Sequence, residues 1–206
     1  MRYSSSLLFL MLSISTSAQT PLNSSTEIAF GRSTHGTGDL SGYYLGFQFD
    51  IPISSKFYWY LGLEATLNDA PDFPLFYEEP NGTMQNATLH FVTSGLQLIG
   101  GGGYRFVNTE KHVFGLSLNP LFRYQATSIS DVIGTIYPAA TGLPIPIRVI
   151  VSETPYRTYS VGASLKVKYQ YKLNEKWQVG LIGGLQSDTN SDTIYYYGLQ
   201  IGRTYF

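Results

Sequence analysis

The sequence predicts an all-β fold, a single eight-stranded antiparallel up-and-down barrel. Three observations lead to this prediction. Apolar and polar residues alternate with a period of two over many segments, which is the pattern of strands rather than helices. Charged residues make up only 13% of the 206 residues, against about 25% in a typical soluble domain. The chain has no cysteine, so its stability must come from backbone pairing and packing rather than from disulfides.

The N-terminus has the order of a secretory signal peptide. Residues 1–2 begin the chain with a positive charge, residues 7–14 (LLFLMLSI) are apolar, and residues 16–18 are small. The apolar run is too short for a spanning helix, which needs about 20 apolar residues. We therefore expect cleavage after Ala18 and a single barrel domain over residues 19–206.

Alternation defines the strands in order along the chain. Residues 43–51 (YYLGFQFDI) place Phe47 on one face and Gln48 on the other, and residues 57–67 and 161–171 alternate in the same way. Nothing after the signal peptide has the period of a long amphipathic helix. The predicted strands are 26–36, 42–53, 57–69, 88–106, 112–126, 158–172, 177–187 and 193–206.

The connections between these strands are of two kinds. Three are short turns, and the connections that alternate with them are mostly longer, above all residues 71–86 and 126–157. Short turns at one end and longer loops at the other are typical of bacterial outer-membrane barrels, with the turns on the periplasmic side. An even number of strands places both termini at the short-turn end.

Alternation alone does not decide which face of the barrel points outward. A soluble lipocalin-like barrel also alternates, with its apolar face inward around a ligand. Two features favour a membrane barrel with the apolar face outward. The polar face carries mainly Gly, Ser, Thr and Gln with few charges, and aromatic residues gather near the strand ends, as in interfacial girdles. They are Phe57, Trp59, Tyr104, Phe106, Tyr169, Tyr171 and Trp177 at the short-turn end, and Tyr43, Tyr124, Tyr159, Tyr195 and Tyr197 at the long-loop end.

Several ionisable side chains fall on the predicted interior face. Buried charges need partners, so we expect an interior salt-bridge network centred on Glu64 and Lys166. Eight strands leave an interior just wide enough for side chains, and we expect the network to fill the lumen rather than to line a narrow channel. The predicted members are Asp50, Glu64, Arg105, Arg123, Lys166 and Lys168.

The segment 126–157 is the predicted contact surface. Apolar residues precede and follow a turn rich in Pro, Ala and Gly, as expected of a hairpin that continues the flanking strands beyond the membrane. A loop folded over the barrel mouth is the alternative. A surface protein or another ligand is the expected partner of this segment, and the candidate contact residues are Ile133, Ile136, Tyr137, Ile145, Ile147 and Val149.

Two local features predict distortions of the barrel wall. Residues 98–106 (LIGGGGYRF) are rich in glycine, but a phosphate-binding loop needs a strand–loop–helix context and usually a lysine. We expect these glycines to let the wall curve while neighbouring aromatic rings lie over the bare backbone. Pro120 falls within a strand that has no free edge, so we expect a bulge or a break there.

No catalytic site emerges from the sequence. His35 follows Ser33 closely, His90 falls at the outer start of the fourth strand and His112 in a turn at the opposite end, and spacing alone does not make a triad. A lipid A-modifying hydrolase remains the alternative to a protein without catalysis. The net charge of −1 gives no case for nucleic acid, and we expect no metal and no cofactor.

Together, the signal peptide, the eight alternating strands and the terminal aromatic residue resemble the OmpA/OmpX-like porin-family barrels of Gram-negative bacteria. The resemblance covers residues 26–206 in architecture and rests on no diagnostic motif. It implies an outer-membrane location in contact with lipid and a structural or surface-interaction role through the outer loops. It also implies that the barrel-assembly machinery reads the terminal Phe206, although Thr204 and Gly202 depart from the apolar alternation usual in the family.

Overall fold

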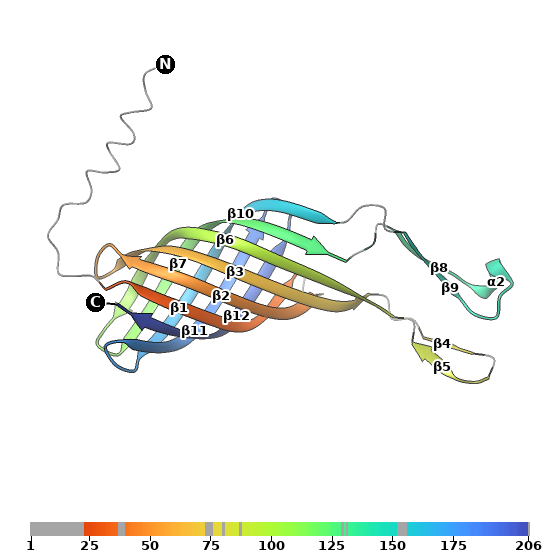
Figure 1. Ribbon diagram of the computed structural model, residues 1–206, viewed down its shortest axis with the longest axis horizontal. Coiled ribbons are helices and arrows are strands. Elements are labelled where there is room, and N and C mark those ends of the chain that lie inside the picture. Colours follow the sequence, from red (N-terminus) through yellow and green to blue (C-terminus); the bar gives the residue numbers. More distant parts are fainter. Residues whose placement is uncertain are drawn as a thin grey trace, which may run out of the picture.

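The computed structural model describes residues 23–36, 40–72, 76–79, 81–86, 88–128, 130, 132–151 and 156–205. It contains one closed barrel and two separate two-stranded sheets (Figure 1). The predicted signal peptide, residues 1–18, and the predicted assembly signal, Phe206, lie outside the described residues. No helix within the described part of the chain has the length and hydrophobicity needed to cross a membrane.

The barrel has eight antiparallel strands, which confirms the predicted fold. Each strand pairs with its neighbours in sequence order, and the first strand pairs with the last to close the barrel. Ser25 lies opposite Thr204, so the first strand begins where the last one ends. The strands are β1 (Ser25–His35), β2 (Leu40–Pro52), β3 (Phe57–Asp72), β6 (Leu89–Asn108), β7 (His112–Thr127), β10 (Arg157–Lys172), β11 (Trp177–Asp188) and β12 (Thr193–Thr204).

Tight turns join β2 to β3, β6 to β7 and β10 to β11 at the end of the barrel where β1 begins and β12 ends. In each turn a short polar side chain accepts a hydrogen bond from the backbone three residues later, a local contact that favours turns. Ser54 Oγ lies 3.0 Å from Phe57 N, Thr109 Oγ1 2.9 Å from His112 N, and Asn174 Oδ1 2.9 Å from Trp177 N. We refer to this end as the turn end and to the opposite end as the loop end.

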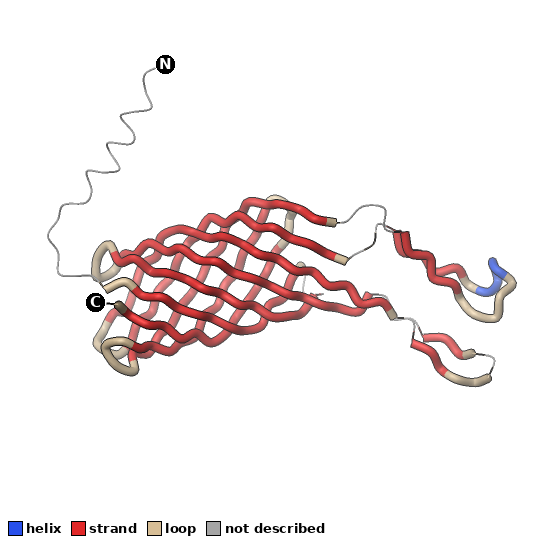
Figure 2. Tube along the Cα trace, in the orientation of Figure 1, coloured by secondary structure: helices blue, strands red, loops and turns tan. Residues whose placement is uncertain are grey.

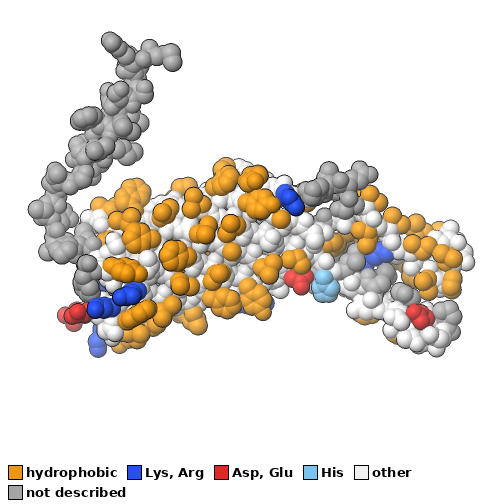
Figure 3. All heavy atoms as spheres, viewed as in Figure 1, with side chains coloured by type: hydrophobic (Ala, Val, Ile, Leu, Met, Phe, Trp, Pro, Cys, Tyr) orange, Lys and Arg blue, Asp and Glu red, His pale blue; other side chains and the backbone are white. Residues whose placement is uncertain are grey.

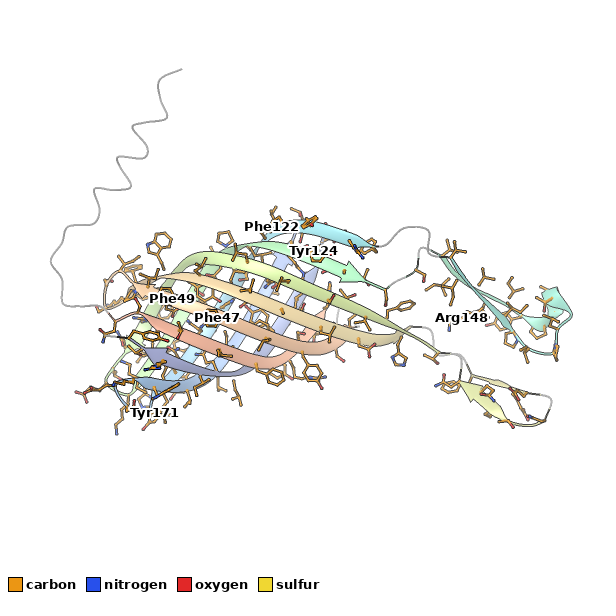
Figure 4. The ribbon with its side chains drawn as sticks, in the orientation of Figure 1. Phe47, Phe49, Phe122, Tyr124, Arg148 and Tyr171 are labelled. Carbon is orange, nitrogen blue, oxygen red and sulfur yellow. The ribbon has the colours of Figure 1, made fainter. Side chains whose placement is uncertain are left out.

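The outer wall of the barrel is apolar and the interior is polar. Phe47 on the outer wall is 50% exposed, whereas its neighbour Gln48 is 1% exposed. Apolar side chains cover the visible wall, and Phe47 and Phe49 lie on it (Figures 3 and 4). The apolar face therefore points outward, as predicted, and the lipocalin-like arrangement with an apolar interior is wrong.

Aromatic side chains gather at the two ends of the outer wall, as the sequence predicts. At the turn end the ring of Tyr104 lies 4.9 Å from that of Phe57 and 5.0 Å from that of Phe106. At the loop end the rings of Tyr124 and Tyr159 lie 5.2 Å apart. Figure 4 shows Tyr124 toward the loop end and Tyr171 at the turn end.

The glycine-rich stretch of β6 accommodates an aromatic ring, and of the two distortions predicted at Pro120 the structure has the break in the ladder and not the bulge. A side chain on Gly103 would overlap the ring of Tyr58, which lies over the bare backbone as expected. The β6–β7 ladder passes from Ile99–Leu121 to Gly102–Leu118 with its register unchanged, so Pro120 causes no bulge. Proline lacks an N–H group, and the strand tolerates it by omitting ladder pairs at that point. The register shift lies instead between Arg105 and Val107.

Two hairpins lie beyond the loop end of the barrel (Figures 1 and 2). One consists of β4 (Phe76–Glu78) and β5 (Met84–Asn86). The other, which we call the ribbon, consists of β8 (Val132–Ile136), the short helix α2 (Pro138–Thr141) and β9 (Ile147–Val151). Of the two arrangements predicted for residues 126–157, the structure has the protruding hairpin. The ribbon is a separate sheet, however, and not a continuation of β7 and β10.

Candidate functional site

The centre of the barrel holds a buried ion pair between strands on different sides of the lumen. Glu64 of β3 and Lys166 of β10 are in contact and are both almost completely shielded from solvent. The Glu64 carboxylate also accepts hydrogen bonds from two tyrosine hydroxyls and one amide. These donors are Tyr44 at 2.5 Å, Tyr60 at 3.3 Å and Gln97 at 2.8 Å.

A second buried cluster lies nearer the turn end. Lys168 lies 2.8 Å from Asp50 and 3.2 Å from Glu27. The Glu27 carboxylate also accepts hydrogen bonds from the side chains of Gln48, Gln170 and Gln178. Sequence reasoning missed Glu27, although the alternation of residues 25–33 places it on the polar face of its strand.

Arg123 lies on the loop side of the central ion pair and has neutral partners. Its guanidinium donates to Gln125 at 3.0 Å, to Gln97 at 2.9 Å and to Thr66 at 2.9 Å. The guanidinium lies against Gly95, where an added side chain would collide with it. Three acceptors satisfy this buried charge, which could not remain in the interior without partners.

Arg105 lies at the turn-end edge of the network, beside the same Tyr58 ring as Lys168. Its guanidinium carbon lies 4.8 Å from the centre of the Tyr58 ring. It lines a recess of about 810 Å³ at the turn end, together with Lys172, Gln170 and Gln178. The six predicted residues thus divide into five that lie in the buried interior and one that faces this recess.

Aromatic rings complete the filling of the central level. The rings of Tyr44 and Tyr196 stack with their centres 4.3 Å apart, and both side chains are buried. The Lys166 ammonium lies 4.6 Å from the centre of the Tyr60 ring. Gln97 donates to Gln186 at 2.7 Å, so β2, β3, β6, β10, β11 and β12 all contribute side chains at this level. Side chains therefore fill the lumen here.

The three histidines lie at separate places. His35 is buried at the loop end of the lumen, with Nε2 3.1 Å from Asp192 Oδ1. Ser33 Oγ donates to the carbonyl of Tyr43 at 3.0 Å rather than to His35. His90 is exposed, 3.5 Å from Asp69, whereas His112 is at the turn end. The structure does not bring these rings together.

Asp192 is expected to make the loop end of the barrel sensitive to acid. The hydrogen bond with His35 lowers the pKa of Asp192 below its ordinary value of 3.8, and Gln125 adds a hydrogen bond at 2.9 Å. A lowered pKa stabilises the folded state above the ordinary value, and this stabilisation is lost as the pH falls through the lowered pKa.

The variant Asp192→Asn should therefore be less stable than the parent at about pH 6, and the difference should shrink as the pH approaches about 3. The measurement is the urea midpoint of unfolding at a series of pH values. A difference that stays constant over this range would show that ionised Asp192 does not stabilise the fold.

The ribbon has one face without charge. Residues directly opposite in an antiparallel ladder point to the same side of the sheet. One face consequently carries Val132, Gly134, Ile136, Ile147, Val149 and Val151, and the other carries Ile133, Thr135, Arg148 and Ile150. Val132 is 57% exposed and Ile136 is 40% exposed, so the uncharged face is open to its surroundings.

The predicted contact residues of this segment do not share one surface. Ile136, Ile147 and Val149 lie on the uncharged face, whereas Ile133 lies on the opposite face with Arg148. Tyr137 precedes α2 at the tip and is 62% exposed, and Ile145 lies in the bend before β9. The tip closes through Gly142, whose φ of 69° and N–H bond to the Pro138 carbonyl end the helix.

Comparison with known proteins establishes the fold. No protein-family description and no curated protein matches the sequence. Neisserial surface protein A (NspA) has a TM-score of 0.52 and 8% identity, covering 89% of this chain and 96% of that chain. Ail, the attachment invasion locus protein of Yersinia pestis, has a TM-score of 0.47 and 10% identity, covering 89% and 98%. The outer membrane enzyme PagL has a TM-score of 0.37 and 14% identity, covering 86% and 97%. The likeness to NspA, together with the closed sheet of eight strands, shows that the chain has the fold of the small outer-membrane barrels.

Proposed function

We propose that this protein is a sealed outer-membrane anchor that presents the ribbon to a partner at the cell surface. Residues 1–18 direct export and are then removed, and the barrel-assembly machinery reads Phe206. The observation that carries the proposal is the uncharged, exposed face of β8 and β9 beyond the loop end of a barrel whose lumen is filled.

The outer wall supports the membrane location. Leucine, isoleucine, valine and aromatic side chains are exposed on every barrel strand, among them Phe30, Leu45, Leu61, Leu98, Phe122, Leu165, Leu181 and Leu199. Exposing a wall of this composition to water would be unfavourable in free energy, whereas acyl chains solvate it well. Tyrosine and tryptophan near both ends of the wall suit the headgroup level of a bilayer.

The interior supports an anchoring role rather than transport. Lys166 is neutralised by Glu64, and Lys168 by Asp50 and Glu27. Charges that satisfy one another in this way hold the strands together, and neither of these two lysines is left without a carboxylate partner. The site of a hydrolase would also need a nucleophile in contact with a base, and Ser33 is bonded to a backbone carbonyl instead of His35.

The ribbon supports a contact role. A contiguous apolar surface held away from the body of a protein marks an interaction site. Its two strands pair only with each other in their sheet, so their outer edges also offer backbone groups to a partner strand. A partner with an apolar surface would therefore be bound mainly by burial of Val132, Ile136, Val149 and Val151.

A cysteine placed on the ribbon should react from outside the cell. The chain has no cysteine of its own, so Val149→Cys and Lys176→Cys each introduce a unique thiol, one on the ribbon and one in a tight turn. We expect a membrane-impermeant maleimide to label Val149→Cys on intact cells. Lys176→Cys should be labelled only after the outer membrane is permeabilised, because the turn faces the periplasm.

The two faces of the ribbon provide a matched pair of positions for testing the contact with a partner. A photo-crosslinking residue at position 149 lies on the uncharged face, whereas one at the adjacent position 150 lies on the opposite face. A partner seated on the uncharged face should be captured from position 149 and not from position 150. Labelling of Lys176→Cys on intact cells, or equal capture from both positions, would contradict the proposal.

A further inference from the structure

A groove crosses the outer wall of the barrel over β10, β11, β12 and β1. Its volume is about 620 Å³. Apolar side chains form its sides, and bare backbone forms part of its floor at Gly183. The side chains that border it include Val167, Leu181, Tyr197, Leu199 and Phe30.

Gly183 keeps the groove open. In the ladders of β11 it lies between Val167 and Tyr197, whose side chains point outward. A Cβ added to Gly183 would meet only the Tyr196 carbonyl oxygen, at 3.8 Å, which is an ordinary van der Waals contact. By contrast, a Cβ added to the inward-facing Gly31 would collide with backbone. Packing of the barrel therefore does not require glycine at position 183.

A cation lies at the loop side of the groove. Arg32 lines the groove and is exposed, and its ladder neighbours are Tyr43 and Tyr197 of the aromatic girdle at the loop end. Its guanidinium carbon lies 4.7 Å from the centre of the Tyr43 ring, which holds the charge against the wall. Among the described residues, no carboxylate forms an ion pair with Arg32.

We propose that this groove is a specific lipid site, in which an acyl chain lies over Gly183 and the phosphate of the same molecule pairs with Arg32. The inference rests on the proposed membrane location. A guanidinium binds phosphate through two parallel hydrogen bonds, and the girdle lies at the depth of lipid headgroups. A lipid that carries a phosphate supplies both an apolar chain for the groove and an anion for Arg32 in one molecule, which is why we favour a lipid over a second copy of the chain.

Native mass spectrometry of the detergent-purified, delipidated protein tests the site. The probes are dioleoyl phosphatidic acid, dioleoylglycerol, which has the same chains without phosphate, and inorganic phosphate. We expect one phosphatidic acid to be retained, with at least about tenfold weaker retention of dioleoylglycerol, since a charge-assisted hydrogen bond contributes about 1.5–3 kcal/mol. Free phosphate should not bind measurably.

Two variants with matched controls decide the assignment. Gly183→Leu should abolish retention of phosphatidic acid by filling the groove. Its control is Gly102→Leu, which adds the same side chain on β6 at another outward position with open space. Arg32→Gln should weaken phosphatidic acid binding about tenfold and remove the preference for phosphatidic acid over dioleoylglycerol. Its control is Arg203→Gln, which removes an arginine stacked on Trp177 at the turn end. This control should change neither the affinity for phosphatidic acid nor the preference.

Three results would overturn the lipid site. They are equal retention by the two leucine variants, equal retention of the two lipids by the parent, and a lipid-free dimer that Gly183→Leu dissociates. Each can occur while the barrel stays folded in membranes, so the proposed function survives them. Recovery of the protein in a soluble fraction would instead overturn the proposed function and the lipid site together.

Discussion

Replacing Lys166 by methionine is expected to lower the free energy of unfolding by about 3–5 kcal/mol, because it leaves a buried carboxylate without its counter-charge. Glu64 has no access to solvent that could replace the lost ammonium. Its remaining donors, Tyr44, Tyr60 and Gln97, are neutral and do not balance the charge. The reciprocal variant Glu64→Gln should cost a similar amount, since it strands the ammonium instead. The measurement is urea unfolding of the barrel in detergent micelles.

The double variant Glu64→Gln/Lys166→Met separates the charge from the packing. It removes both ions and keeps similar volumes, and replacing a whole buried pair is often nearly neutral. We expect the double variant to be more stable than either single variant. Lys176→Met, in an exposed turn, is the control for the loss of a lysine and should change the midpoint little. Additive single-variant effects would show that the two side chains do not stabilise the barrel as a pair.

The seam between the first and last strands should not tolerate a side chain at Gly31. Gly31 lies directly opposite Gly198 in the β1–β12 ladder. A Cβ on Gly31 would collide with the Tyr197 carbonyl, and one on Gly198 with the Phe30 carbonyl. These obstacles are backbone groups of the closing ladder and cannot rotate away as a side chain would. Overpacking costs about 1–3 kcal/mol and sometimes more, and we expect Gly31→Val to reach at least the upper end of this range.

The electrophoretic shift on boiling reports whether the barrel closes. A folded membrane barrel resists detergent and changes mobility only when boiled. Most of the Gly31→Val protein should migrate at the unfolded position without boiling, and Gly183→Ala should behave like the parent because its added Cβ has room. A normal shift for Gly31→Val would mean that the seam relaxes without loss of stability.

The sequence determined the strands and the faces of this protein, because side-chain direction in a strand repeats every two residues and is a local property. Alternation in residues such as 43–51 was enough to predict which side chains point outward. The short gaps between alternating segments also predict the tight turns, and these turns are local because Ser54, Thr109 and Asn174 accept hydrogen bonds from the backbone three residues later.

The sequence predicts Glu64 and Lys166 as the centre of the interior network, but only the tertiary structure decided the other pairings inside the barrel. Glu27 and Gln178, for example, are 151 residues apart. Their contacts depend on the tilt and stagger with which eight strands close, which no local pattern contains. The position of Arg105 beside the turn-end recess and the groove over Gly183 depend on that closure as well. Local alternation thus fixed the two surfaces of the wall, and the geometry of closure fixed the sites on them.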